Sequence, residues 1–300
     1  MTEVLRVSEE VAGALAGDGP VVALETSVLA QGLPVPQNLD AAAAMGQAIR
    51  SRGAVPAWVA VEAGAVRVGL ADEDLARLAE PGRASKVARR DLPVALASGG
   101  LGATTVSSTL WAAHRAGIEV MATGGIGGVH HRSGDVSADL LELARTAGLV
   151  VCSGPKSIVD PAATAERLEE LGVAVVGYRC DRLPFFVVLE ADVELEHRVE
   201  SPAAAADVAR SRRDLGVGSS VLLYNPVPQG HALDRDVVDA AIRGCEDRAE
   251  SEGVRGKDVT PFLLSCLSDR TNGASLEANL ALLESNAALA AEVAAALAAT

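Results

Sequence analysis

Residues 118–156 carry the sequence IEVMATGGIGGVHHRSGDVSADLLELARTAGLVVCSGPK. A short apolar run at 118–122 ends in a glycine-rich turn, residues 138–147 have helical spacing, and a second apolar run follows at 149–152. An alternation of buried strand, helix and buried strand is typical of parallel sheets covered by helices. The stretch therefore predicts an α/β fold.

The same alternation extends along the rest of the chain. Apolar, valine-rich runs predict buried strands at residues 21–24, 58–61, 92–97, 118–122, 149–152, 173–176 and 221–223. Helical spacing is found at residues 39–50, 107–116, 138–147, 162–171, 203–215, 234–252 and 275–298. Residues 57–62 and 65–69 read as two strands joined at a tight turn, which predicts a hairpin and a partly mixed sheet. Because no linker or internal repeat interrupts the pattern, we expect a single domain over residues 1–300.

The composition argues against nucleic acids and membranes as partners. The formal net charge of −14 opposes binding to a polyanion, and an aromatic content of 2% offers little surface for stacking on bases. No apolar run is expected to reach the length of a membrane span. A hydrophobic content of 49% with few aromatics predicts a large core built from small side chains.

The cysteines and the N-terminal residues bear on the cellular compartment. Cys152, Cys180, Cys245 and Cys266 are far apart and form no Cys-x-x-Cys pair, so we expect them to be reduced, without a zinc knuckle or redox motif. Residues 1–10 lack the basic and apolar regions of a signal peptide. The sequence therefore predicts a cytoplasmic protein.

Lysine is scarce in this chain. Only three of the 26 basic side chains are lysines, namely Lys86, Lys156 and Lys257. Unlike arginine, a lysine that is desolvated or placed beside another cation can lose its proton and attack a carbonyl or sugar carbon. Lys156 follows the apolar run at 149–152 and is the best candidate for such a nucleophile; the alternative is an ordinary surface lysine.

The ends of the predicted strands carry polar or glycine-rich residues. Glu25, residues 98–106, residues 123–130 and Lys156 each follow an apolar run. In open α/β sheets, ligands bind beyond the carboxyl ends of the strands, so these residues are expected to converge. The glycine turns suit a small phosphoester, although they also fit simple strand-to-helix turns. They match neither the dinucleotide fingerprint nor a triphosphate loop.

Residues 130–139 form the most polar loop in the middle of the chain. Asp135 is a candidate ligand for Mg²⁺ or Mn²⁺, with water and a substrate phosphate completing the coordination. The alternative is that Ser137 caps the helix that follows, with Asp139 in its first turn. Helix capping and metal or substrate binding by this loop are compatible. No correctly spaced third ligand supports zinc, so His130 is expected to contact substrate or orient a carboxylate.

Glu25, Lys86 and Lys257 each admit two interpretations. Glu25 is either a carboxylate stabilised by hydrogen bonds or a functional acid in a partly buried place. Lys86 lies near Glu25 or belongs to a solvated basic run at 86–91. Lys257 is typical of a solvated turn, although a helix start at 260–261 leaves a ligand role open.

Several longer segments occur in an order that is specific to one family. They are Val22-Ala23-Leu24-Glu25, Lys86-Val87 with Arg89-Arg90-Asp91-Leu92-Pro93, Gly102-Ala103-Thr104-Thr105-Val106, Ala122-Thr123-Gly124-Gly125-Ile126-Gly127-Gly128-Val129-His130, Ser137-Ala138-Asp139-Leu140, Lys156-Ser157-Ile158, Thr260-Pro261-Phe262-Leu263-Leu264 and Ser275-Leu276 with Asn279. With these segments the chain closely resembles pseudouridine-5'-phosphate glycosidases, from about residue 20 to the C-terminal helix.

The resemblance implies an activity, a cofactor and an assembly. Members of that family reversibly cleave the C–C glycosidic bond of pseudouridine 5'-phosphate to uracil and ribose 5-phosphate. The resemblance further implies one Mn²⁺ per subunit and a homotrimer of α/β/α domains. It implies that Lys156 attacks C1' and forms an imine with the opened ribose, that Glu25 is the proton donor, and that Asp135 is the metal ligand. The substrate-binding positions it implies are Lys86, Val106, Ser137, Ala138, Asp139, Thr123, His130 and Asn279.

Two other functions are compatible with the same residues. One is a C-glycosynthase of a natural-product pathway, in which the same chemistry attaches ribose 5-phosphate to another carbon acid. The other is a non-catalytic protein that binds sugar phosphates. The presence of Glu25, Lys86, Asp135 and Lys156 together argues against a non-catalytic role.

Overall fold

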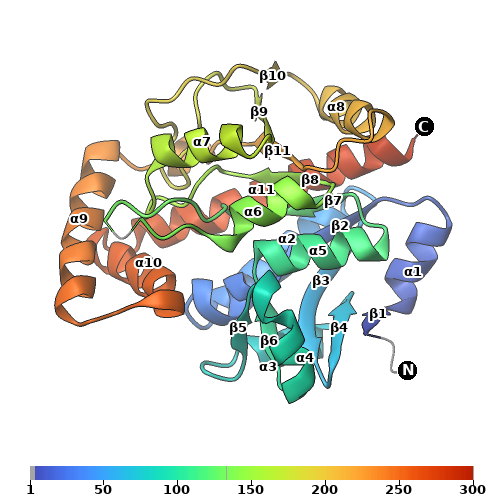
Figure 1. Ribbon diagram of the computed structural model, residues 1–300, viewed down its shortest axis with the longest axis horizontal. Helices are drawn as coiled ribbons and strands as arrows, with labels where there is room; N and C mark the ends of the chain where they lie inside the picture. Colours follow the sequence, from blue (N-terminus) through green and yellow to red (C-terminus); the bar gives the residue numbers. More distant parts are fainter. Residues whose placement is uncertain (1–3, 133, 300) are drawn as a thin grey trace.

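The computed structural model describes residues 4–132 and 134–299, and its centre is one large sheet (Figure 1). Within these residues the sheet has eleven strands, in the order β1-β4-β3-β2-β7-β8-β11-β9-β10, while β6 pairs with β3 and β5. The strands are β1 (Leu5–Val7), β2 (Val21–Glu25), β3 (Val55–Glu62), β4 (Ala65–Val68), β5 (Ser85–Val87), β6 (Gly102–Thr104), β7 (Val120–Ala122), β8 (Leu149–Cys152), β9 (Ala174–Tyr178), β10 (Arg198–Val199) and β11 (Val221–Tyr224).

The sheet is mostly parallel and partly mixed. β2 pairs in parallel with β3 and β7, and the parallel pairing continues through β8, β11, β9 and β10. β3 pairs antiparallel with β4 and β6. The antiparallel register of Glu62 with Ala65 places a tight turn between β3 and β4, so the predicted hairpin and mixed α/β sheet are confirmed.

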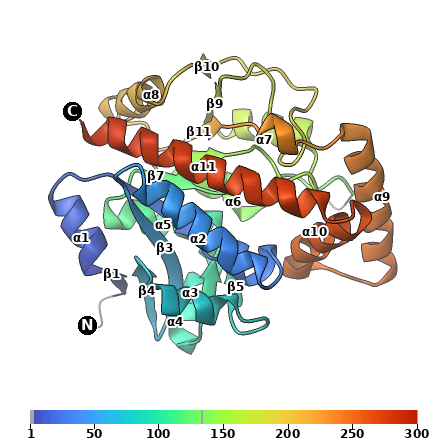
Figure 2. The same cartoon turned by 180° about the vertical axis from the view of Figure 1, so that it is seen from behind.

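Helices cover both faces of the sheet. α5 and α6 lie on the face seen in Figure 1, and α2 and α11 lie on the opposite face, seen in Figure 2. The helices are α1 (Glu9–Ala16), α2 (Gln37–Arg50), α3 (Asp72–Ala79), α4 (Leu92–Ser98), α5 (Val106–Ala116), α6 (Ala138–Arg145), α7 (Pro161–Glu170), α8 (Pro202–Asp214), α9 (Arg235–Ser251), α10 (Val259–Arg270) and α11 (Ala274–Ala298). Short helical turns are η1 (Val28–Gly32), η2 (Arg89–Asp91), η3 (Gln229–His231) and η4 (Gly256–Asp258).

The strand predicted at residues 92–97 is wrong, because these residues form α4. Pro93 lies in the first turn of this helix, where its missing N–H needs no partner. Only Leu92 is buried, while Val94 is 72% exposed, so the run lacks the two buried faces of a central strand. Periodicity does not distinguish so short an apolar run from a helix. The strand that leads into α5 is instead β6.

α11 corrects the expectation that no apolar run reaches the length of a membrane span. Its 25 residues are long and apolar enough by length and composition. The helix nevertheless packs within the domain, against α2, α8 and strands β2, β7 and β8. Ala278, Leu282 and Ala290 are fully buried there. Packing on the core of its own chain therefore accounts for its apolar character.

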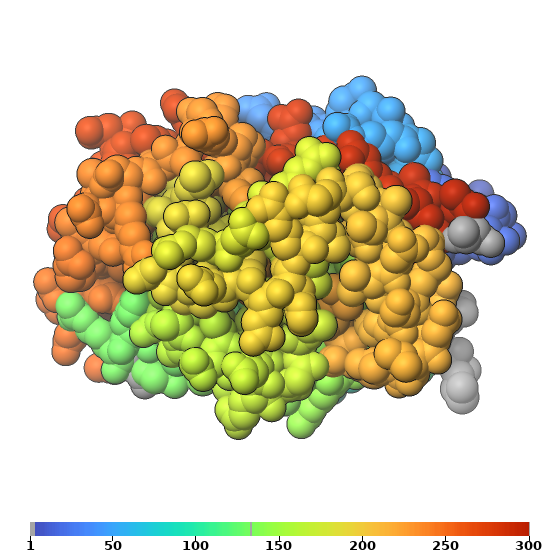
Figure 3. All heavy atoms as spheres, turned by 90° about the horizontal axis from the view of Figure 1, so that it is seen from above, coloured from blue at the N-terminus to red at the C-terminus, as the bar shows by residue number. Residues whose placement is uncertain are grey.

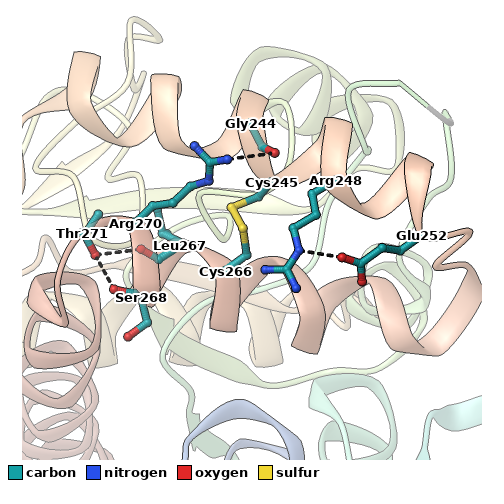
Figure 4. Close-up of a disulfide and its surroundings, with 9 residues drawn as sticks. All are labelled: Gly244, Cys245, Arg248, Glu252, Cys266, Leu267, Ser268, Arg270 and Thr271. Atoms are coloured by element: carbon teal, nitrogen blue, oxygen red, sulfur yellow. Dashed lines mark hydrogen bonds and ion pairs between the residues drawn. A yellow bond between two sulfur atoms is a disulfide. The ribbon is translucent and has the colours of Figure 1, made fainter.

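The expectation that all four cysteines are reduced is wrong for two of them. Cys245 of α9 and Cys266 of α10 form a disulfide (Figure 4), whereas Cys152 and Cys180 are free. The two bonded cysteines are separated by 21 positions in the sequence, and only the packing of α9 on α10 brings them together, so no local pattern marks the pair. The disulfide joins the two helices that flank η4.

Candidate active site

One cavity of about 190 Å³ lies beyond the carboxyl ends of β2, β7 and β8. Its position follows from the parallel strands, whose carboxyl ends meet at one edge of the sheet. All eleven of the site residues expected from the sequence line it, namely Glu25, Lys86, Val106, Thr123, His130, Asp135, Ser137, Ala138, Asp139, Lys156 and Asn279. The structure thus brings together residues from strand ends, helix starts and the C-terminal helix.

Glu25, the last residue of β2, is a buried carboxylate held by two hydroxyl groups. It is 4% exposed, and Ser27 Oγ donates a hydrogen bond to its Oε2 at 2.5 Å. Thr123 Oγ1 donates to the other carboxylate oxygen. The interpretation of Glu25 as a carboxylate stabilised by hydrogen bonds is confirmed. Glu25 also lines the cavity, and its role as a functional acid stays a prediction.

Two lysine amines face the same cavity. Lys156 follows β8, and its backbone N–H donates to Ile126 O at 3.0 Å, which fixes the turn that carries it. The pKa of Lys86 is lowered, first by burial and then by the positive charge of Lys156, while Asp139 and Glu25 oppose the shift. Lys86 is therefore part of the site and not of a solvated basic run.

Asp139 joins three segments around the cavity. Its Oδ1 accepts a hydrogen bond from Ser107 N at 3.1 Å, and its Oδ2 accepts one from Gly127 N at 3.0 Å. Ser137 Oγ accepts from Asp139 N at 3.2 Å, which confirms the predicted cap of α6. Gly127 has no room for a side chain, because an added Cβ would lie 2.3 Å from Ser137 Oγ. This carboxylate fixes the starts of α5 and α6 and the glycine turn relative to one another.

Substitution Asp139→Asn is expected to lower the free energy of unfolding by about 1–3 kcal/mol, because one amide N–H group would then face a backbone N–H group. Urea denaturation of the variant and the wild-type protein measures the difference. Asp236→Asn, in the exposed first turn of α9, is the matched control and is expected to change stability by less than about 0.5 kcal/mol. Equal stability of the Asp139→Asn variant and the control would contradict this structural role.

The loop that carries His130 and Asp135 is attached to α9. Arg132 forms ion pairs with Asp247 at 2.7 Å and with Glu246 at 3.3 Å. Figure 3 shows this segment, in green, beside the orange surface of α9. The pKa of His130 is lowered, mainly by burial, with the charge of Asp135 opposing the shift. A neutral imidazole at this place suits contact with a substrate.

The side chains at Asp135 fit a hydrated divalent ion and not a closed protein cage. Within residues 4–132 and 134–299, no group of three or more His, Cys, Asp or Glu side chains is placed to hold a metal. Mg²⁺ and Mn²⁺ are commonly held by one or two carboxylates together with waters and substrate phosphates. Asp135, with His130 beside it in the cavity wall, offers a donor set of that kind.

Other residues of the cavity wall are Lys257, Phe186 and Gln31. Lys257, for which the sequence left a solvated turn and a ligand role open, lies in η4 with its side chain 47% exposed, and its Nζ donates to Asp91 Oδ2 at 2.8 Å and to Lys86 O at 3.2 Å. The scarcity of lysine was the one signal that marked it. Phe186 and Gln31 also line the wall, and they carry no motif that would have marked them.

The fold and the cavity define an α/β enzyme whose site, lined by lysine amines and a buried glutamate, lies at the carboxyl edge of the sheet. The chain belongs to the family described as indigoidine synthase A like protein, whose sequence model matches residues 10–296. The resemblance to pseudouridine-5'-phosphate glycosidases is confirmed by relatives of that name over nearly the whole chain.

Three of these similar proteins illustrate the relationship. The pseudouridine-5'-phosphate glycosidase of Sorangium cellulosum (strain So ce56) is 48% identical over 98% of this chain and 93% of its own length. The prealnumycin C-glycosynthase AlnA, solved in complex with ribulose 5-phosphate, is 41% identical with a TM-score of 0.91, covering 100% of this chain and 98% of its own. An indigoidine synthase A-like protein of Thermotoga maritima is 35% identical with a TM-score of 0.90, covering 98% and 97%.

Proposed function

We propose that this protein is a pseudouridine-5'-phosphate glycosidase that reversibly cleaves the C–C glycosidic bond of its substrate, giving uracil and ribose 5-phosphate. The observation that carries the proposal is the convergence of Lys156 and Glu25 on one cavity in a chain whose curated relatives bear that name. Release of uracil from pseudouridine 5'-phosphate in the presence of Mn²⁺, measured by chromatography, tests it. Absence of release would contradict it.

The cavity supports a mechanism through a lysine imine. Lys156 Nζ attacks C1' of the ribose, the C1'–N bond forms and the C1'–O4' bond breaks, and a proton passes from the attacking nitrogen to O4', which opens the ring and leaves a neutral secondary amine. In the step that breaks the C–C bond, Glu25 acts in its protonated form: it donates its proton to the base carbon, and the nitrogen lone pair expels uracil as the protonated C1'=N imine forms, whose proton returns to Glu25 on hydrolysis. Water then hydrolyses the imine and regenerates the amine with ribose 5-phosphate.

The phosphate is expected at two helix starts. α5 begins at Val106 and α6 at Ala138, and both residues line the cavity. Backbone N–H groups at helix N-termini, together with Ser137 and Lys86, suit a small phosphate. Thr123 holds Glu25, while Asn279 lies beside the glycine turn, where an added Cβ on Gly124 would meet its Oδ1 at 3.4 Å. These placements support the substrate-binding roles of the residues.

Mn²⁺, one ion per subunit, would be held by Asp135 and would supply positive charge for the substrate's anionic oxygens. Asp135→Ala is therefore expected to abolish activation of uracil release by Mn²⁺, because the carboxylate that holds the ion is gone. Activity titrated with Mn²⁺ measures this, and circular dichroism checks the fold. Activation that persists unchanged in the variant would contradict the role of Asp135.

We further propose a homotrimer located in the cytoplasm, as the family resemblance implies. A small phosphorylated sugar derivative as substrate and a soluble chain are consistent with the relatives. Light scattering of the purified protein across a range of concentrations tests the trimer, and a monomer at all concentrations would contradict it.

A C-glycosynthase acting on a larger carbon acid is the second candidate. The observation that favours it is an adjoining cavity of about 430 Å³, which shares Gln31, Phe186 and Leu264 with the catalytic cavity. The structural neighbour AlnA bears this activity in its name. Formation of C-glycosides from ribose 5-phosphate with aromatic carbon acids, at rates above that with uracil, would favour this candidate.

A further inference from the structure

Gln31 carries a buried acceptor without a partner. Its Nε2 donates to Ala84 O at 2.9 Å, but its Oε1 is buried and accepts no hydrogen bond within residues 4–132 and 134–299. The orientation of the amide is fixed, because the carbonyl oxygen of Ala84 accepts only from the NH₂ side. The other end of the amide must therefore be an oxygen. Since an unpaired buried acceptor is costly, such a group calls for a donor from outside the protein.

The neighbouring amide of Asn38, by contrast, is hydrogen-bonded at both ends. Asn38 Nδ2 donates to Leu29 O and to Ala79 O, each at 3.0 Å. Its Oδ1 accepts from Leu39 N at 2.9 Å. The fold satisfies this structural amide at both ends, so the unpaired oxygen of Gln31 requires a separate explanation.

Gln31 lies on the side of the cavity where the base must bind. It belongs to η1, which follows β2, the strand that ends with Glu25. Glu25 has to reach the base carbon to protonate it, so the base lies on the Glu25 side of the ribose. Gln31 lines the catalytic cavity and also the adjoining one, and the apolar side chains of Phe186 and Leu264 belong to both walls. A flat ring between such side chains is well accommodated.

We infer that Gln31 Oε1 accepts a hydrogen bond from a ring N–H of the pyrimidine, which makes Gln31 a determinant of base specificity. The inference rests on the proposed function. Uracil joined to ribose through carbon has both of its ring nitrogens protonated, so it offers the donor that an amide oxygen needs. A carbon acid without an N–H at this place would leave Oε1 unpaired, and sites built around such a hydrogen bond reject analogues that lack it.

The test runs the reaction toward synthesis, from ribose 5-phosphate with uracil, 1-methyluracil or 3-methyluracil. In the wild-type protein, methylation of the contacted nitrogen is expected to lower kcat/KM by about tenfold or more. Gln31→Met keeps the length of the side chain, and its kcat/KM for uracil is expected to fall by about tenfold. The drop in kcat/KM caused by methylation of the contacted nitrogen is expected to be smaller in this variant than in the wild type. Gln47→Met, the same change on an exposed position of α2, should behave like the wild type.

Either of two results would overturn the inference. One is that the wild-type protein uses 1-methyluracil and 3-methyluracil as fast as uracil; this result does not depend on any variant. The other is an unchanged pattern of methyl penalties in Gln31→Met. Borohydride trapping of ribose 5-phosphate on Lys156 separates this failure from that of the proposed function, because trapping needs no base. If ribose 5-phosphate is trapped on Lys156 but the discrimination between uracil and its methylated forms is unchanged in Gln31→Met, only the inference about Gln31 is contradicted. If the wild-type protein traps no ribose 5-phosphate, the proposed function is contradicted as well.

Discussion

Lys156→Arg is expected to lower kcat for uracil release by about 10⁴-fold or more, the scale seen when a covalent nucleophile is removed. The substitution keeps a positive charge at the cavity but removes the amine, because a guanidinium stays protonated at accessible pH. The expected loss of kcat would therefore come from the missing nucleophile and not from a missing positive charge. Steady-state kinetics of uracil release measures it.

Two measurements complete the test of Lys156. Calorimetric titration with ribose 5-phosphate is expected to show binding to the Lys156→Arg variant, whereas Lys156→Ala, which also loses the charge, should bind it more weakly. Neither variant should gain mass after treatment with ribose 5-phosphate and borohydride. Turnover of Lys156→Arg within tenfold of the wild type would rule out an imine at this lysine.

Glu25→Gln is expected to lower kcat by about 10²–10⁴-fold, the usual contribution of a general acid. The amide has nearly the same shape, and its oxygen can still accept from Ser27 or Thr123, so the change removes mainly the proton. Trapping of ribose 5-phosphate on Lys156 should persist, because imine formation from the free sugar involves no base carbon. A lowered kcat for uracil release with unchanged trapping of ribose 5-phosphate would show that Glu25 acts in the step that breaks the C–C bond.

Glu80→Gln, an exposed carboxylate outside the cavity, is the matched control and should leave kcat unchanged. Loss of trapping in Glu25→Gln, parallel to its loss of cleavage, would argue against proton donation to the base. In that case Glu25 would act earlier, on the formation of the imine itself.

The parts of the site that could be predicted lie at the ends of parallel strands. Glu25 ends β2, and Lys156 follows β8, so the order of the strands along the chain suffices to bring them to one edge. Ser137 was recognisable as a helix cap from its local sequence. In these cases the signal and its structural consequence lie within a few residues of each other.

The parts that could not be predicted depend on contacts between distant segments. The unpaired oxygen of Gln31 is defined by a hydrogen bond to Ala84, 53 residues away, and Lys257 meets Lys86 across 171 residues. The disulfide of Cys245 and Cys266 depends in the same way on how α9 packs on α10. The error at α4 has another cause, since the short apolar run at residues 92–97 satisfies the pattern of a strand and of a short helix alike.

The central claim is that this protein cleaves the C–C bond through an imine on Lys156. The most direct test is to incubate it with pseudouridine 5'-phosphate and Mn²⁺, add borohydride, and map the modified peptide by mass spectrometry while uracil is measured. We expect uracil release and a reduced ribose phosphate adduct on Lys156. Uracil release with no adduct on Lys156 would contradict it.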